Sequence, residues 1–308
     1  MRVSIICPIY NGEKYLEGLH KNLLRQKKFD IEQLEIIYVL TESKDKSKLI
    51  LDKLGTRYYE ITPDEFSHSK TREMMVNKAT GDIVVFISQD VIMKDEVWLY
   101  NLVNPIIAGE CEASFSRQLC TNNTIEKYIR LNNYPDQSRI VSQDDVTKLG
   151  LMTFFYSDAS SAIKRELYLN LNGYDNKDLI INEDMYIAYK IINSGNRIKY
   201  CADSQVYHSH IFTLTQLFNR YFDTGVFLKE NSHFLEYGSN GSGISLAKGV
   251  FKNALSERNY RVILNILPNF GARFIGSNLG KRYDKLSKDK VIKFSLNKRY
   301  WTKKNRGV

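Results

Sequence analysis

Apolar and polar residues alternate along the first hundred residues with a period that switches between strand and helix. Short runs of branched and aromatic residues predict strands over residues 3–9, 35–40, 57–61 and 83–87. Apolar residues at helical spacing predict helices over residues 12–26, 44–54, 69–79 and 95–107. This regular succession predicts an α/β fold, in which a mostly parallel sheet is covered by helices on both faces.

The middle of the chain is less regular, and its C-terminal part is helical. We predict strands over residues 113–117, 159–164, 197–201 and 205–208, and helices over residues 165–171 and 183–193. After Phe212 the apolar residues recur at helical spacing, so we place a domain boundary near residue 211. The expected units are an α/β domain, 1–211, and a helical C-terminal region, 212–308. The segment YGSNGSG, residues 237–243, is predicted to be a flexible loop between two helices.

Three polar segments follow predicted strands of the N-terminal sheet. They are Tyr10-Asn11-Gly12, Thr41-Glu42-Ser43 and the region of Asp90. Ligands of open α/β sheets bind at the carboxyl ends of the strands. We therefore expect these three segments to converge on one ligand-binding crevice.

Composition and charge narrow the choice of partners. The chain has 308 residues and a net charge of +9, and residues 280–308 contain eleven Lys or Arg against two Asp, so the tail holds the whole excess. A neutral body argues against general binding of nucleic acid, because that needs cations spread over a surface. Aromatic and aliphatic residues lie among the cations of the tail, which predicts contact with an anionic membrane surface; a solvated basic tail is the alternative.

Cysteine usage and hydropathy favour a cytoplasmic protein. The four cysteines are far apart and form no C-x-x-C pair, which favours reduced thiols. The N-terminus enters a strand-like segment without the features of a signal peptide, and no apolar run reaches the ~18 residues that span a bilayer. We therefore expect a cytoplasmic protein, peripheral at the inner face of the cell membrane.

Several carboxylates and histidines carry candidate chemistry. Asp90 directly after a buried strand could bind Mg²⁺ or Mn²⁺, or simply cap a helix. His208 and His210 point the same way in an extended segment and could bind the same cation, or form a buried hydrogen-bonded pair. Glu183 and Asp184 begin a helix, where acids are favoured by the helix dipole; one of them could also act as a general base.

The order of motifs resembles family 2 glycosyltransferases of the GT-A fold. The motifs are CPIYNGEKYL, SKD, FSHSKTRE, ISQD, SSAIKRELYLNLNGYD, NED and VYHSH. The likeness extends to bacterial rhamnosyltransferases of polysaccharide synthesis, through F-x-H-x-x-x-R, Gln-Asp, H-S-H and the segment NYPDQSRI. It covers residues 1–225 strongly and the tail more loosely.

The resemblance implies a role for each matching residue. It implies that the nucleotide-sugar donor is bound by Pro8, Tyr10, Asn11, Glu13, Glu42, Arg72 and Gln89. It implies that Asp90, with His208 and then His210, binds Mg²⁺ or Mn²⁺. Asp184 matches the carboxylate that takes the acceptor proton, and Glu183 stands beside it. Two departures are present: the D-x-D element is Ser88-Gln89-Asp90, with one acid missing, and Leu40 replaces the acid that contacts the base in many relatives.

The implied function is inverting, metal-dependent glycosyl transfer. The expected donor is dTDP-L-rhamnose, and the expected acceptor is a lipid-linked or growing cell-wall or capsular polysaccharide. A UDP-sugar donor is the alternative within this family. A non-catalytic polysaccharide-assembly protein is the alternative outside enzymes.

Overall fold

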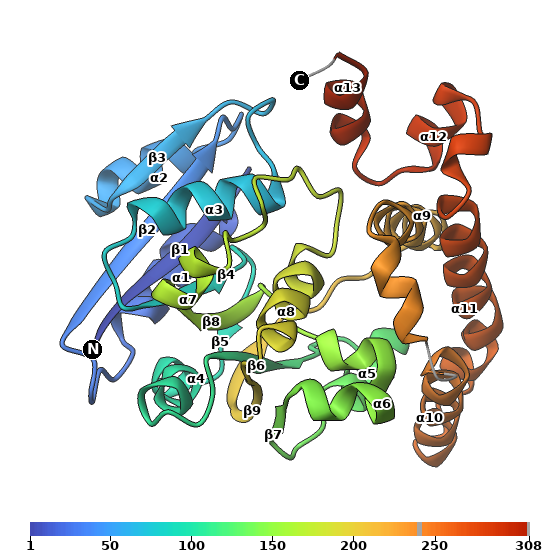
Figure 1. The fold of residues 1–308 in the computed structure, drawn as a ribbon, viewed down its shortest axis with the longest axis horizontal. Coiled ribbons are helices and arrows are strands. Elements are labelled where there is room, and N and C mark those ends of the chain that lie inside the picture. The colour runs from blue at the N-terminus through green and yellow to red at the C-terminus, as the bar shows by residue number, and fades with distance from the viewer. Residues whose placement is uncertain (239–241, 307–308) are drawn as a thin grey trace.

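The computed structural model describes residues 1–238 and 242–306, and it has a twisted mixed sheet at its centre (Figure 1). The strands of this described part are β1 (Arg2–Ile9), β2 (Gln33–Thr41), β3 (Tyr58–Ile61), β4 (Ile83–Ile87), β5 (Ile92–Met93), β6 (Ala113–Leu119), β7 (Arg139–Val141), β8 (Ser160–Lys164) and β9 (Ile198–Tyr207).

Helices flank this sheet and make up most of the chain after β9. They are α1 (Glu13–Leu24), α2 (Ser47–Leu54), α3 (His68–Lys78), α4 (Trp98–Ile107), α5 (Ile125–Asn133), α6 (Val146–Leu149), α7 (Arg165–Asn170), α8 (Glu183–Asn193), α9 (Leu214–Glu230), α10 (Ser242–Ser256), α11 (Tyr260–Gly280), α12 (Lys288–Phe294) and α13 (Lys298–Arg306). Short 3₁₀ segments are η1 (Gln143–Asp145), η2 (Gly150–Phe154), η3 (Ser232–Tyr237) and η4 (Tyr283–Lys285).

The strand order confirms the predicted mostly parallel N-terminal sheet. The order is β3-β2-β1-β4-β8-β6-β9-β5, and β7 pairs with the N-terminal part of β9. Strands β1 to β4 are parallel, whereas β8 runs antiparallel to both β4 and β6. Every side chain of β4 is buried, as expected for a central strand covered on both faces. Because β1, β2 and β4 are parallel neighbours, their carboxyl ends lie at one edge of the sheet.

Several elements after β4 differ from the prediction. The strands expected over residues 197–201 and 205–208 form one strand, β9, whose pairing with β6 shifts between Ser116 and Arg117. Such a bulge inserts extra residues without ending the strand, so the polar residues at its centre looked like a turn. The short strands β5 and β7 and the helices α5 and α6 were not predicted. The predicted loop over residues 237–243 falls partly outside the described residues, and α10 begins at Ser242.

The C-terminal helices share one hydrophobic core with the sheet. Phe222 and Val226 of α9 belong to the same buried cluster as Phe86 of β4. In the tail, Val291, Tyr300 and Trp301 are also buried in this cluster. The prediction that these apolar tail residues are available to a membrane is therefore wrong, because the protein itself buries them.

Partly buried hydrogen bonds attach the tail to the body of the protein. The Asp223 carboxylate accepts the backbone N–H groups of Leu296 and Asn297 at 2.9 and 3.0 Å. Lys303 donates to the carbonyl oxygen of Phe66 at 2.6 Å. In Figure 1, α13 lies at the top of the view, next to α12. Among the described residues, no helix is long and apolar enough to cross a membrane.

Three glycines allow α9 and α11 to cross at very close range. A Cβ atom on Gly280 would lie 2.0 Å from the carbonyl oxygen of Phe222, and one on Gly276 would lie 2.4 Å from that of Phe218. On α9, a Cβ atom on Gly225 would meet the carbonyl oxygen of Ser277 at 2.2 Å. Only glycine fits at these contacts, so the two helix backbones touch directly.

Replacing Gly280 with alanine is expected to lower the free energy of unfolding by about 1–3 kcal/mol, because the added methyl group forces the two backbones apart. Gly271→Ala on the same helix is the matched control. Nothing lies within 4 Å of a Cβ atom at that position, so this change should stabilise the protein by about 0.5–1 kcal/mol. Urea unfolding of both variants measures the difference, and equal stabilities would contradict the contact.

Candidate active site

The loops after β1 and β2 are locked together at the carboxyl edge of the sheet. The backbone N–H of Asn11 donates to the Ser43 hydroxyl at 2.9 Å, and the Asn11 side chain accepts from the N–H of Lys44 at 3.2 Å. Glu13 accepts from the N–H of Lys46 at 2.9 Å, while the Asp45 carboxylate accepts from the N–H of Glu13 at the same distance. The expected convergence of these strand ends is confirmed.

Four more of the residues predicted to bind the donor lie at the same edge. Pro8 is half-buried and next to the last residue of β1, and Glu42 is exposed directly after β2. The Tyr10 ring is 42% exposed. Gln89 holds Tyr10 in place, since its amide accepts from the Tyr10 N–H at 2.9 Å and donates to the Tyr10 carbonyl at 3.0 Å. Gln89, in the D-x-D position, thus ties the end of β4 to the end of β1.

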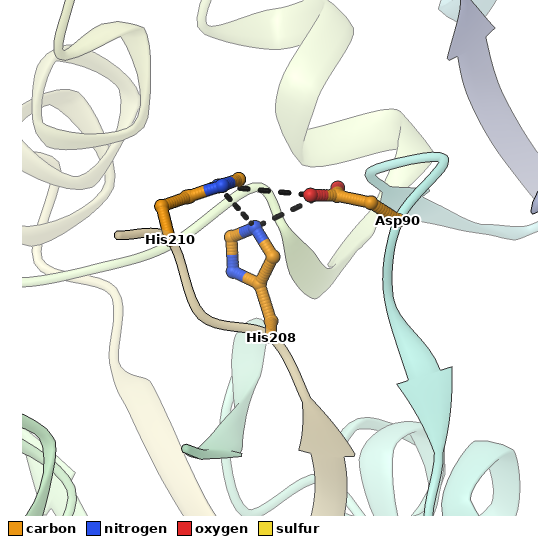
Figure 2. Close-up of side chains that lie close together, drawn as sticks. All are labelled: Asp90, His208 and His210. Carbon is orange, nitrogen blue, oxygen red and sulfur yellow. Dashed lines mark hydrogen bonds and ion pairs between the residues drawn. The ribbon is translucent and has the colours of Figure 1, made fainter. Parts of the chain in front are cut away.

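Asp90, His208 and His210 form a cluster whose side chains point toward one another (Figure 2). Asp90 comes from the loop between β4 and β5, and the histidines directly follow β9. The Nε2 atoms of both histidines lie 3.6 Å from Asp90 carboxylate oxygens and 3.0 Å from each other. One potential ligand atom from each residue lies within 4.8 Å of the other two. The structure therefore brings together all three predicted metal ligands.

The surroundings of His208 fit a metal ligand. Its Nδ1 lies 2.9 Å from Oε1 of Gln118, an acceptor that also receives a hydrogen bond from Arg130. Because Oε1 can only accept, Nδ1 carries the proton and the Nε2 lone pair faces Asp90 and His210. Burial, with help from the charge of Arg130, holds the pKa of His208 well below its usual value, so the imidazole is neutral. Neutral imidazoles with one carboxylate suit Mn²⁺ better than Mg²⁺, which prefers oxygen ligands alone.

The two predicted catalytic acids begin α8 and have different environments. The Glu183 carboxylate accepts a hydrogen bond from Arg72 at 3.1 Å, and Arg72 also donates to the carbonyl oxygen of His68 at 2.8 Å. Arg72 is only 5% exposed. Burial would raise the pKa of Glu183, but His68 and Arg72 outweigh it and hold the pKa below its usual value. Arg72, which was predicted to bind the donor, thus lies beside the two predicted catalytic acids, where it keeps Glu183 ionised.

Asp184 has the opposite shift. Burial is the largest cause, and the negative charges of Glu183 and Asp158 add to it, so the pKa of Asp184 lies well above its usual value. Its carboxylate accepts from the backbone N–H of Met185 at 2.8 Å and makes no ion pair with a described residue. A carboxylate with raised proton affinity and no cation bound to it is suited to take up a proton.

Asp158 belongs to this acid cluster and was missed by sequence reasoning. It is 2% exposed, accepts hydrogen bonds from Ser161 at 2.9 Å and Tyr174 at 2.7 Å, and lies 4.0 Å from Nε of Arg72. Burial raises its pKa, and the charge of Arg72 opposes that rise. A single acid in the segment YSDASS has no partner at a recognisable spacing, so no sequence signal pointed to it.

Two exposed arginines also face the candidate site. The charge of Arg220, on α9, acts on both halves of the site: after burial, it helps to lower the pKa of His210 and opposes the rise in the pKa of Asp184. Arg299, on α13, stacks over the Tyr10 ring at 5.5 Å from its centre. Neither arginine was predicted as a site residue, and nothing in the sequence placed Arg299 near Tyr10.

Relatives with similar sequences match almost the whole chain. The chain is 32% identical to the O-antigen chain rhamnosyltransferase RfbN of Salmonella typhimurium (strain LT2), over 98% of this chain and 96% of the relative. It is 31% identical to the O-antigen chain rhamnosyltransferase WbaN of Salmonella anatum, over 97% of this chain and 95% of the relative. These similarities extend through the C-terminal helices and the tail.

Solved structures share the fold at lower sequence identity. The mannosyltransferase PcManGT of Pyrobaculum calidifontis, in complex with GDP-Man and Mn²⁺, superposes with a TM-score of 0.61 at 15% identity, over 92% of this chain and 88% of that chain. Residues 1–349 of S. aureus TarS, in complex with UDP, give 0.56 at 16% identity, over 100% and 92%. The fold is thus of the GT-A type. The model of glycosyl transferase family 2 matches residues 4–171, and with its full-length relatives this shows that the chain is a glycosyltransferase of family 2.

Proposed function

We propose that this glycosyltransferase moves a rhamnosyl group from dTDP-L-rhamnose to a saccharide acceptor, with inversion at the anomeric carbon. The observation that supports rhamnose is the similarity to two O-antigen chain rhamnosyltransferases over nearly the full length of both chains. Relatives of this length share the C-terminal helices as well as the sheet, so the similarity covers both sides of the candidate site.

The different environments of the two acids support different roles in the proposed reaction. Asp184, with its raised pKa, accepts the proton of the acceptor hydroxyl as that oxygen attacks the anomeric carbon. Glu183 is held ionised by Arg72 and keeps the proton affinity of Asp184 high through its charge. A single attack opposite the leaving group inverts the anomeric centre. The structure thus favours Asp184 over Glu183 as the base.

The leaving group of the proposed reaction is the nucleoside diphosphate. Asp90, His208 and His210 would hold a divalent cation, which would neutralise the negative charge that develops on the diphosphate. Tyr10, Asn11 and Glu13 lie at the neighbouring strand ends, where they would bind the nucleotide. Arg220 and Arg299 bring further positive charge toward the same edge. The acceptor is a lipid-linked or growing polysaccharide, and the protein works at the cytoplasmic face of the cell membrane.

A donor screen tests this proposal. The full-length protein, with Mn²⁺ or Mg²⁺, is given dTDP-L-rhamnose, UDP-glucose, UDP-N-acetylglucosamine and GDP-mannose, and release of each nucleoside diphosphate is measured. We expect turnover of dTDP-L-rhamnose to exceed that of every other donor. A preference for a UDP-sugar would show that the protein uses the alternative class of donor. No turnover of any donor would count against a catalytic role.

The pH dependence of turnover tests the assignment of the base. Asp184 works only without its proton, so activity should fall as the pH drops through its raised pKa, at a higher pH than an ordinary aspartate would give. In Glu183→Gln the neighbouring negative charge is lost, the pKa of Asp184 falls, and the acid limb should move to lower pH. Glu17→Gln, on the exposed face of α1, is the control and should leave the limb in place. An unchanged limb in Glu183→Gln would contradict this coupling.

A further inference from the structure

The outer face of α11 exposes a continuous row of large apolar side chains. Leu264 is 80% exposed, Leu267 is 83% exposed and Phe274 is 72% exposed. Tyr260 and Ile275 are exposed on the same helix. On a helical wheel these five positions fall within an arc of about 100°. Soluble proteins rarely expose a contiguous row of large apolar side chains, which indicates that this face contacts a partner.

This exposure does not come from a loosely attached helix. The opposite face of α11 is fixed to the body by the glycine contacts with α9 described above, and Val262 and Asn269 are buried there. Arg273 pairs with Glu126 at 2.9 Å and also donates to the hydroxyl of Tyr221. A firmly anchored helix therefore presents the apolar row outward, and Figure 1 shows α11 along the outer edge of the molecule.

The preceding helix, α10, also exposes large apolar side chains. Ile244, Phe251 and Leu255 of α10 are also exposed, whereas Val250 and Ala254 pack inward. We refer to the exposed apolar residues of α10 and α11 together as the helical face. Its members are Ile244, Phe251, Leu255, Tyr260, Leu264, Leu267, Phe274 and Ile275.

The charges beside the helical face have one sign. Lys248, Lys252, Arg258 and Arg261 are exposed, and none of them makes an ion pair with a described residue. From residue 243 to residue 279, Glu257 is the single acid in the sequence, and it is already bound to Lys127 and Tyr128. The free charge around the apolar row is therefore positive.

We propose that the helical face docks on the surface of an anionic lipid bilayer. Apolar side chains flanked by Lys and Arg fit such a surface, because the side chains enter the acyl boundary while the cations meet the headgroups. A second copy of this chain is a poorer occupant. A twofold interface would place the same unpaired cations opposite one another, and the resulting repulsion opposes association.

Membrane docking goes beyond the proposed transfer reaction. It rests on the proposed function only for the advantage that docking would give the enzyme. A lipid-linked acceptor would lie at the same bilayer, so docking would bring the candidate active site to its substrate. Binding to lipid itself needs neither donor nor acceptor. The inference also replaces the tail as the docking segment, since Tyr300 and Trp301 are buried within the protein.

Vesicle flotation with the full-length protein tests the proposal. The vesicles are phosphatidylcholine alone or phosphatidylcholine with phosphatidylglycerol, and the readout is the fraction of protein that floats. We expect binding to the anionic vesicles, weakened by salt, and much less binding to the neutral ones. Leu264→Glu combined with Leu267→Glu should lower partitioning by ~10-fold or more, because two charges replace side chains that would enter the bilayer.

Matched controls separate docking from other effects. Leu49→Glu places the same charge on a leucine that is 65% exposed on α2, and it should float like the unchanged protein. Lys252→Gln with Arg261→Gln should reduce binding to the anionic vesicles and weaken its salt dependence. Every substituted side chain is exposed, and thermal melting should confirm unchanged stability for all variants.

Three results would overturn the proposal. The first is flotation of the Leu264→Glu, Leu267→Glu variant at the level of the unchanged protein. The second is absence of binding of the unchanged protein to anionic vesicles. The third is light scattering that shows a dimer which this double substitution converts to a monomer. Turnover of soluble donor should be equal in all variants, so a failure of the proposed function would appear separately as inactivity of the unchanged protein.

Discussion

Replacement of Asp184 with asparagine is expected to reduce glycosyl transfer by ~10²-fold or more. Asparagine keeps the size and the backbone contact of this side chain but cannot accept a proton from the acceptor hydroxyl. The carboxylate makes no ion pair with a described residue, so its loss leaves no buried cation without a partner. The fold and the binding of nucleotide should therefore be unchanged, and the loss should lie in the catalytic rate.

Steady-state transfer and calorimetric binding of the nucleoside diphosphate measure the two effects separately. Asp144→Asn, at an exposed position of η1, provides the control and should retain full transfer. Near-normal transfer by Asp184→Asn would remove Asp184 from the role of base and leave Glu183 as the next candidate. Loss of nucleotide binding in the variant would show instead that Asp184 contributes to binding of the donor.

Removal of the metal ligands is expected to have the second-largest effect. In Asp90→Asn the cluster loses its only negative charge, so we expect weaker binding of Mn²⁺ and a fall in transfer of ~10²-fold, in line with the several kcal/mol that a bound cation supplies. EDTA should suppress transfer by the unchanged protein, and added Mn²⁺ should restore it more fully than Mg²⁺, given two imidazole ligands.

Calorimetric titration with Mn²⁺ in the presence of dTDP gives a readout that does not depend on turnover. Asp203→Asn, an exposed aspartate within β9, is the matched control and should bind Mn²⁺ normally. Full transfer in EDTA, together with unchanged Mn²⁺ binding by Asp90→Asn, would show that this cluster is not a metal site. The two histidines would then be explained by their mutual contact and by the hydrogen bond from His208 to Gln118.

The sequence predicted those parts of the fold in which local pattern and tertiary burial agree. Strand β4 was located from its unbroken apolar run, because a strand buried on both faces needs apolar side chains at every position. Helix α8 was located from its apolar period and its acidic first turn. The convergence of Tyr10, Glu42 and Asp90 followed from topology alone, since parallel strands end at a common edge.

Contacts between residues far apart in the chain could not be predicted from local sequence patterns. The hydrogen bonds of Asp158 come from Ser161 and Tyr174, and its ion-pair partner Arg72 is 86 positions earlier in the chain. The apolar residues of the tail have the composition of an interfacial segment, and only the packed structure shows that Trp301 faces the protein interior. The helical face was predicted only as helix, and the exposure of its apolar residues is visible only in the packed structure.

The contact of the C-terminal helix with the N-terminal strands has a consequence for how the protein is made. Arg299 and Tyr10 are 289 positions apart, so at ~5–20 residues per second a ribosome would need about 15–60 s to deliver the second partner after the first. Throughout that interval the apolar surface that Tyr300 and Trp301 will cover stays exposed on the nascent chain. A chain shortened at its C-terminus never covers this surface, and such exposed apolar surface promotes aggregation during expression.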